Sequence, residues 1–185
     1  MTFCLNMQMN WLKYMLSACL LFALSDCQHN YTDDAVVENS EEQDFLADHA
    51  FFFAQEEKYR IVQYVKRSPL AFAQTGTGLY RAVIKTGKGN NIQKGDWVTL
   101  HYKVYGLDGS LYYQSTDKPF SLLVEKQEAE TGLHQGLMGL QEQSLAVLIL
   151  PSHLAHGLMG DLEKIPARMP ICWEIEILYV QSSNY

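Results

Sequence analysis

The stretch GDWVTLHYKVYGLDGSLYY, residues 95–113, has the pattern of a β-hairpin. Its first half alternates apolar side chains with Thr, His and Lys, a period of two that is typical of a strand with one buried face. The apolar positions are Val98, Leu100, Tyr102 and Val104. GLDG at residues 106–109 predicts a turn, and SLYYQS at residues 110–115 predicts the returning strand. Two paired strands are therefore expected here.

Further strands and one short helix are predicted around this hairpin. GLYRAVIKTGKG alternates and then turns at residues 78–89, and FSLLVE alternates at residues 120–125. SLAVLIL, residues 144–150, predicts a central strand. EKQEAETGLHQGLMGL, residues 125–140, predicts a helix with its leucines on one face.

The last predicted strand is ICWEIEILYV, residues 171–180. One face is expected to carry Ile171, Trp173, Ile175, Ile177 and Tyr179, and the other Cys172, Glu174 and Glu176. The expected fold class is therefore α+β, an antiparallel sheet with one solvent-exposed side and a single short helix on its dry side. Cys172 is interpreted as a small, partly buried residue without a redox role.

A longer helix is predicted before the sheet. SEEQ at residues 40–43 has the spacing of a capping box, and a helix is expected over residues 41–66, ending at Ser68-Pro69. Phe51, Ala54, Ile61, Val62 and Val65 would share one of its faces. The FFF cluster at residues 51–53 is expected to pack against the following domain.

Composition and charge narrow the class of protein. The chain has 185 residues, of which 48% are hydrophobic, so it can bury a core, and its formal net charge is −7. Nine acidic residues and no Lys or Arg lie between Gln28 and Glu57. A nucleic-acid binder needs a basic face, so nucleic acid is not an expected partner. The polar, acidic residues 27–44 are interpreted as a solvated tether.

The N-terminus has the pattern of an export signal. MNWLKYMLSACLLFALSDC, residues 9–27, carries one Lys, a short apolar run and then small and polar residues. LSDC resembles a bacterial lipobox, so residues 1–26 are interpreted as a lipoprotein signal peptide and Cys27 as the lipidated residue that anchors the chain to a membrane. Asp26 departs from the lipobox pattern, and an ordinary secretory signal or an uncleaved anchor stays open as an alternative.

From about residue 76 to residue 180 the chain resembles the FKBP-type peptidyl-prolyl isomerases. The motifs are GDWVTLHYKVYGLDGSLYY, KPFSLLVEKQE, GLHQGLMGL, LILPSHLAHG and GDLEKIPARMPICWEIEIL, in the family's order and spacing. The resemblance implies a twisted antiparallel sheet wrapped over a short helix, with an aromatic-lined site between them. Residues 76–185 are therefore assigned to this domain, and residues 45–75 to a helical extension before it.

The resemblance also implies the site residues. The catalytic residues would be Tyr102, Tyr112, Phe120, Ile165 and Trp173, and the substrate-binding residues would be Tyr113, Ala129, Leu133 and His156. The backbone N–H of Ile165 would donate to a carbonyl of the bound peptide. PSHLAHGLMGDLEKIPARMP, residues 151–170 and called the long loop from here on, would arch over the site, which explains its unusual length.

Three positions depart from the family pattern. Tyr113 stands where the family usually has an aspartate, Leu133 replaces the tryptophan of the site's floor, and His156 replaces a tyrosine. Two hypotheses follow: a membrane-tethered isomerase, or a catalytically weak FKBP-fold chaperone or binding component of an envelope or motility complex. The spacing of His153 and His156 is not matched by Cys or carboxylate ligands, so neither a metal nor another cofactor is expected.

The resemblance also implies a cellular location and binding partners. The lipobox, the preceding helix and HGLMGDLEKIP look most like the lipid-anchored FKBPs linked to gliding motility in Bacteroidetes-type bacteria. This implies the bacterial cell envelope, with the chain facing the periplasm and held at the inner or outer membrane. The expected partners are proline-containing polypeptide clients, exported envelope proteins among them.

Overall fold

The computed structural model describes residues 34–115, 117–126 and 129–182. The predicted signal peptide and Cys27 lie outside these residues. The chain divides into two compact units, Met1–Asp48 and His49–Tyr185, and the second holds the whole sheet. Within the described residues, no helix is both long and apolar enough to cross a membrane.

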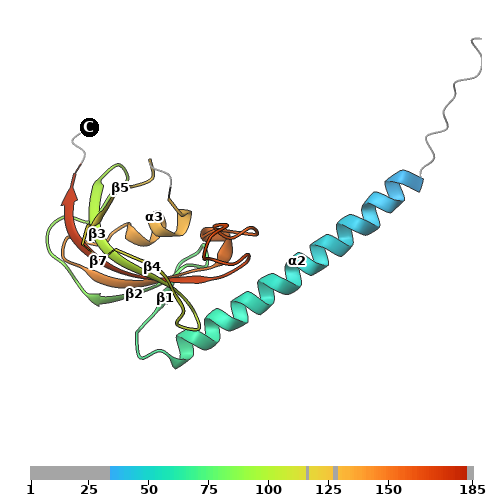
Figure 1. Ribbon diagram of the computed structural model, residues 1–185, viewed down its shortest axis with the longest axis horizontal. Helices are drawn as coiled ribbons and strands as arrows, with labels where there is room; N and C mark the ends of the chain where they lie inside the picture. The colour runs from blue at the N-terminus through green and yellow to red at the C-terminus, as the bar shows by residue number, and fades with distance from the viewer. Residues whose placement is uncertain (1–33, 116, 127–128, 183–185) are drawn as a thin grey trace, which may run out of the picture. The chain divides into compact units, whose positions relative to one another are not determined.

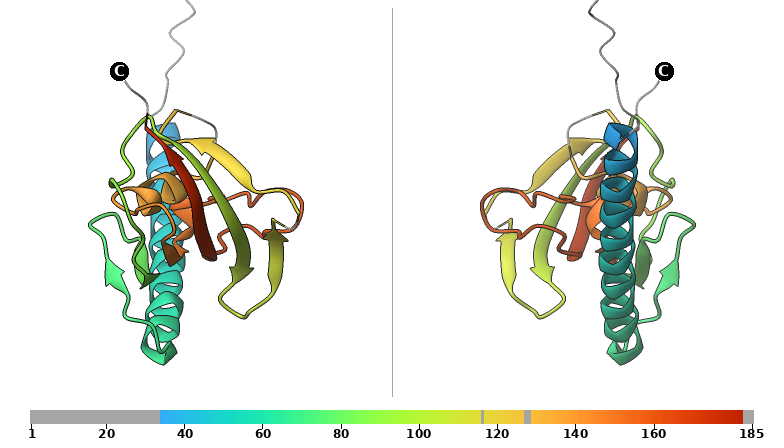
Figure 2. Two further views of the ribbon diagram at one scale, coloured as in Figure 1. Left: turned by 90° about the vertical axis from the view of Figure 1, so that its left-hand side faces the viewer. Right: turned by 90° about the vertical axis from the view of Figure 1, so that its right-hand side faces the viewer.

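A single antiparallel sheet forms the centre of the second unit. Its order is β1-β2-β6-β7-β3-β4, and β5 also pairs with β3, beside the start of that strand. Figures 1 and 2 show the strands twisting past one another. The strands are β1 (Ala73–Gln74), β2 (Tyr80–Lys85), β3 (Trp97–Gly106), β4 (Leu111–Gln114), β5 (Phe120–Leu123), β6 (Leu145–Leu150) and β7 (Ile171–Gln181). The predicted α+β class is confirmed.

Helix α3 (Thr131–Leu137) covers one face of this sheet (Figure 1). Its two glycines allow the close approach, because a Cβ at Gly136 would lie 2.3 Å from Leu148 Cδ1 and one at Gly132 would lie 2.5 Å from Leu150 Cγ. The helix is shorter than the predicted residues 125–140, since the backbone is extended at Glu130 before it (φ −60°, ψ 133°) and leaves helical geometry at Met138 after it (φ −55°, ψ 128°). The alternating apolar residues of β3 and β7 and the leucines of α3 form the main core beneath it.

The opposite face is covered in part: Lys103 and Glu176 are exposed as predicted for a solvent-facing side, but the region around β6 is buried. Ile61 of helix α2 (Asp34–Arg67) packs with Val147, Ile149 and Cys172, all of them buried. Burial raises the pKa of the Cys172 thiol to about 11, so the thiol is neutral near pH 7. β6 is therefore covered on both faces, as expected for a central strand.

Helix α2 also differs from its prediction. It begins at Asp34 instead of residue 41, so the tether expected over residues 27–44 is helical from Asp34 onward. Acidic side chains are favourable in the first turns of a helix, and Glu, Ala and Gln are good helix formers. Of the FFF cluster, Phe51 and Phe52 are 66% and 63% exposed, against the prediction, whereas Phe53 contacts Arg168 of the following domain.

The last strand changes phase near its end. The face predicted for β7 is buried as far as Ile177, but Tyr179 is 55% exposed, against the prediction. The register explains this, because Thr99 pairs with Tyr179 while the next residue, Leu100, pairs with Ile177. The extra residue between them is a β-bulge, which turns the following side chains to the other face.

Candidate functional site

Three aromatic side chains from three strands meet on the face of the sheet that carries α3. Tyr102 of β3 lies between Phe120 of β5 and Trp173 of β7. The ring centroids of Tyr102 and Phe120 are 5.8 Å apart at an interplanar angle of 78°, and those of Tyr102 and Trp173 are 5.0 Å apart at 39°. Both arrangements are favourable for aromatic pairs. These three residues are called the aromatic triad below.

Most of the other predicted site residues gather around the aromatic triad. Leu133 of α3 and Ile165 of the long loop are buried in the same apolar cluster. Tyr112, Tyr113 and Ala129 are partly buried and pack against it. The structure thus brings together, in one cluster, side chains that lie as far apart in sequence as Tyr102 and Trp173.

Two cavities open at the edges of this cluster. One, of about 400 Å³, is lined by Tyr102, Phe120 and the segment between β4 and β5. The other, of about 390 Å³, is lined by Ala129 and the start of α3. An extended ligand could therefore reach the aromatic triad from one side and the start of α3 from the other.

Trp173 carries a polar atom that the fold leaves unused. The side chain is 5% exposed, and its Nε1 is buried without a hydrogen-bond partner in the described part of the chain. Most buried donors in proteins are paired, because an unpaired one forfeits its hydration. The indole N–H is therefore an unpaired donor that a bound carbonyl could accept from only after the groups that cover it move aside.

His156 joins the site through an acidic partner that sequence reasoning missed. Its Nε2 lies 3.0 Å from Oε1 of Glu130, the residue that precedes α3. Glu130 follows Ala129, which packs against the cluster. The pair bridges the long loop and the start of α3, so it places His156 at the rim of the site.

The predicted ligand donor is already engaged. The backbone N–H of Ile165 donates to Oδ1 of Asp161 at 2.7 Å, and the same oxygen accepts from the N–H groups of Glu163 and Lys164, each at 2.9 Å. The expectation that the Ile165 N–H binds the peptide carbonyl stays a prediction, and in this structure such a carbonyl would compete with Asp161 for the donor. An aspartate that accepts from the backbone N–H groups just after it forms a tight turn.

Tyr113 ties this turn to the hairpin. Its hydroxyl donates to Asp161 Oδ2, and Lys164 Nζ lies 4.8 Å from the centroid of the Tyr113 ring. Desolvation raises the pKa of Asp161, but the hydrogen bonds from Tyr113 and from the three backbone N–H groups outweigh it and lower this pKa to about 2. The hydrogen bond to Asp161 in turn raises the pKa of Tyr113. Tyr113 thus fastens the loop at the place where the family usually has an aspartate.

The histidines of the long loop do not form a metal centre with other ligands. His153 Nε2 lies 3.3 Å from the carbonyl oxygen of Thr77, while His156 faces Glu130. Among the described residues, no three His, Cys, Asp or Glu side chains gather closely enough to hold a metal ion.

Known proteins resemble the region that contains this site. The family model described as FKBP-type peptidyl-prolyl cis-trans isomerase matches residues 88–178. The peptidyl-prolyl cis-trans isomerase FKBP12 of Arabidopsis thaliana is 32% identical over 111 residues, which cover 56% of this chain and 99% of that protein. The crystal structure of FkpA from Escherichia coli has a TM-score of 0.62 at 25% identity and covers 91% of this chain and 82% of that one.

Longer relatives are matched only in part. The FKBP-type peptidyl-prolyl cis-trans isomerase FkpA of Buchnera aphidicola subsp. Baizongia pistaciae is 29% identical over 108 residues. That match covers 58% of this chain but 43% of the Buchnera protein. The chain thus spans less than half of the Buchnera protein's length, and the match to the family model falls in the domain that holds the aromatic triad and the long loop.

Proposed function

This chain belongs to the FKBP-type peptidyl-prolyl cis-trans isomerase family, and we propose that residues 76–185 catalyse cis–trans isomerisation of X-Pro bonds in polypeptide clients. The observation that carries the proposal is the aromatic triad, gathered with Ile165 and Leu133 at one apolar site. The nine predicted site residues keep their proposed roles, with Ile165 contributing its side chain and, where a peptide carbonyl displaces Asp161, its N–H.

An apolar aromatic site suits this reaction. Rotation about a peptide bond has a barrier of about 18–20 kcal/mol, because resonance gives the C–N bond partial double-bond character. For X-Pro bonds both isomers are populated, and they exchange over tens to hundreds of seconds. Water stabilises the planar, polar amide more than the twisted transition state, and an apolar wall removes that advantage. The reaction requires neither a nucleophile nor a proton transfer.

A refolding assay tests the activity. We expect micromolar concentrations of the chain to accelerate the slow, proline-limited phase of a client protein's refolding. A client whose refolding has no proline-limited phase serves as the control and should be unaffected. No acceleration by a correctly folded sample would overturn the enzymatic proposal. If that sample still bound unfolded clients, the second candidate function, a chaperone or binding component, would be favoured, in line with the occupied Ile165 N–H.

We also propose that a lipid on Cys27 anchors the chain to a membrane. The support is the apolar run followed by LSDC at residues 24–27. Cys27→Ser should move the protein from the membrane fraction to the soluble fraction, as measured by immunoblotting after ultracentrifugation. Cys19→Ser, within the apolar run, is the matched control and should leave the distribution unchanged. Equal membrane association of the two variants would exclude lipidation at Cys27 as the anchor.

The proposed cellular role follows from the activity and the anchor together. A tethered isomerase facing the periplasm would act on exported envelope proteins whose folding waits on proline isomerisation. The resemblance to FKBPs linked to gliding motility makes components of a motility complex candidate clients. The acidic segment before the domain supports a position away from the lipid surface, since anionic membranes repel it.

A further inference from the structure

Helix α2 presents three side chains of one face to the long loop. Phe53, Glu57 and Arg60 are separated by four and three residues, so they lie on the same side of the helix. All three belong to the second compact unit, together with the sheet and the loop. Each contacts the loop near one of its ends.

Glu57 holds the beginning of the loop. Its Oε1 accepts a hydrogen bond from the backbone N–H of Ser152 at 2.5 Å, and its Oε2 accepts one from Ser152 Oγ at 2.6 Å. Ser152 is only 9% exposed and opens the short 3-10 helix η1 (Ser152–Leu154). Hydrogen bonds to a carboxylate are about twice as strong as neutral ones.

Phe53 and Arg60 hold the end of the loop. The Arg168 guanidinium lies 4.2 Å from the centroid of the Phe53 ring, and Arg60 Nη2 lies 3.8 Å from Met169 Sδ. The end of the loop is also joined to its first half, because the backbone N–H of Arg168 donates to the carbonyl of Gly157 at 2.9 Å. Helix α2 therefore contacts the long loop near both of its ends.

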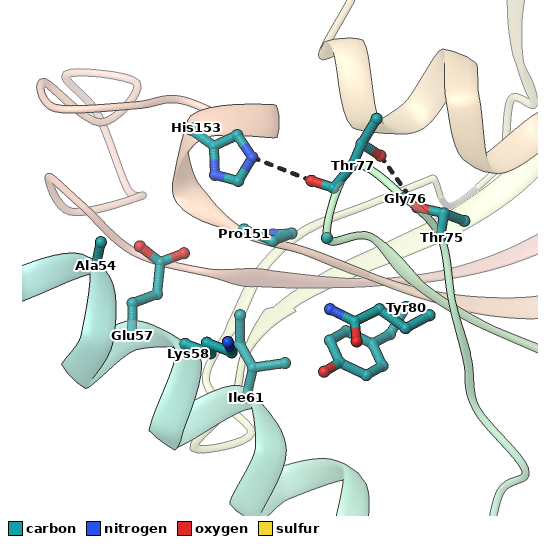
Figure 3. A pocket seen from close by; sticks show the side chains of 12 residues that line it. Ala54, Glu57, Lys58, Ile61, Thr75, Gly76, Thr77, Tyr80, Pro151 and His153 are labelled. Atoms are coloured by element: carbon teal, nitrogen blue, oxygen red, sulfur yellow. Dashed lines mark hydrogen bonds between the residues drawn. The ribbon is translucent and has the colours of Figure 1, made fainter. Parts of the chain in front are cut away.

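A cavity lies beside Glu57. It has a volume of about 350 Å³ and lies between α2, the turn after β1 and the start of the long loop (Figure 3). Figure 3 shows Glu57 pointing from α2 toward the segment of Pro151 and His153. Open space therefore adjoins the carboxylate on this side, while on the other side Leu154 packs the start of the loop into the main core.

The loop in turn forms part of the proposed isomerase site. It carries Ile165, which is buried in the cluster of the aromatic triad, and His156, which pairs with Glu130. It leads directly into β7, two residues before Trp173. A shift of about 1 Å in such an element can reduce a catalytic rate by about 100-fold.

We propose that Glu57 is a positioning residue for the isomerase site, acting through Ser152 to hold the long loop over the aromatic triad. Helix α2 is then a structural part of the enzyme as well as a connection to the tether. This inference rests on the proposed function.

The test compares Glu57→Ala and Glu57→Gln with Glu56→Ala in the full chain. Glu56 is the neighbouring acidic residue, exposed on a different side of the helix, and so it is the matched control. Two quantities are measured: amide hydrogen exchange of the long loop by mass spectrometry, and kcat/KM in the refolding assay. Glu57→Ala should accelerate exchange in the loop about tenfold and lower kcat/KM by a similar factor, while Glu56→Ala changes neither. Glu57→Gln keeps one acceptor oxygen and should fall between them.

A double-mutant cycle with Ser152→Ala identifies the route. If Glu57 acts through Ser152, the losses in kcat/KM of Glu57→Ala and Ser152→Ala should be less than additive when combined. Additive losses, or exchange that rises equally in the loop and across the sheet, would overturn a positioning role. Should Glu57→Ala fail to fold, Glu57→Gln carries the comparison. An inactive wild type would overturn the proposed function, and loop exchange would still decide whether Glu57 holds the loop.

Discussion

Trp173→Ala is expected to lower the free energy of unfolding by about 3–5 kcal/mol, the usual cost of truncating a buried tryptophan. The side chain is 5% exposed, and its ring contacts Tyr102 in the centre of the aromatic triad. Its loss would leave a cavity under both the hairpin and the long loop. Urea unfolding followed by circular dichroism measures the change.

The same variant should lose nearly all isomerase activity under conditions in which it remains folded. Trp173→Phe separates the two effects, because phenylalanine keeps an aromatic ring against Tyr102 while it removes the unpaired Nε1–H. Phenylalanine is smaller than tryptophan, so Trp173→Phe should also lose some stability, but less than Trp173→Ala does. Trp173→Phe removes no hydrogen bond within the described fold. A fall in kcat/KM that the loss of stability does not account for would therefore assign the indole N–H to the bound peptide.

Equal activity of the wild type and Trp173→Ala, in a sample shown to be folded, would remove the aromatic triad from the proposed mechanism. If the activity loss matched only the unfolded fraction at the assay temperature, Trp173 would be a core residue alone.

Alternation was sufficient to predict most of the sheet. Val98, Leu100 and Val104 are buried in β3 as expected, because strand side chains alternate strictly between faces. The failure at Tyr179 came from a bulge, which depends on how two strands align and leaves no signal in one strand's own pattern. The packing of helix α2 on the second face of the sheet was not predicted, because it too depends on tertiary placement. Ile61 and Phe51 both fit the apolar face of the helix, but of these two only Ile61 packs against the sheet.

The polar contacts of the site could not be predicted from spacing. The aromatic and apolar residues were identified from the resemblance to a family, whereas Glu57, Glu130 and Asp161 were not singled out. Glu57 is 95 residues from Ser152, and Tyr113 is 48 residues from Asp161. Side-chain pairs at such separations depend on tertiary placement. Only the turn formed by Asp161 has a local signal, an aspartate followed by the backbone groups that it caps.

Asp161→Ala is the second change expected to have a large effect, on activity more than on stability. It would free three backbone N–H groups and the Tyr113 hydroxyl together, so residues 161–165 should lose their fixed conformation. We expect kcat/KM to fall by about 10–100-fold, the scale of a misplaced binding element. Asp161→Asn is the matched control, since its Oδ1 can still accept from the backbone, and it should lose less. Equal losses in the two variants would mean that the charge, and not the turn, matters.

The same carboxylate should make the loop sensitive to acid. The folded-state pKa of Asp161 is lowered to about 2 from an ordinary value of 3.8, so its contribution to loop order is fully present above about pH 4 and is lost as the pH falls toward 2. The amide signals of Glu163 and Ile165, followed by NMR, should therefore titrate with a midpoint well below 3.8 in the wild type and not at all in Asp161→Asn. A midpoint at or above 3.8 would show that the carboxylate is not held by these donors in solution. A low midpoint would show that the Tyr113 hydroxyl and the backbone N–H groups hold this carboxylate ionised in solution.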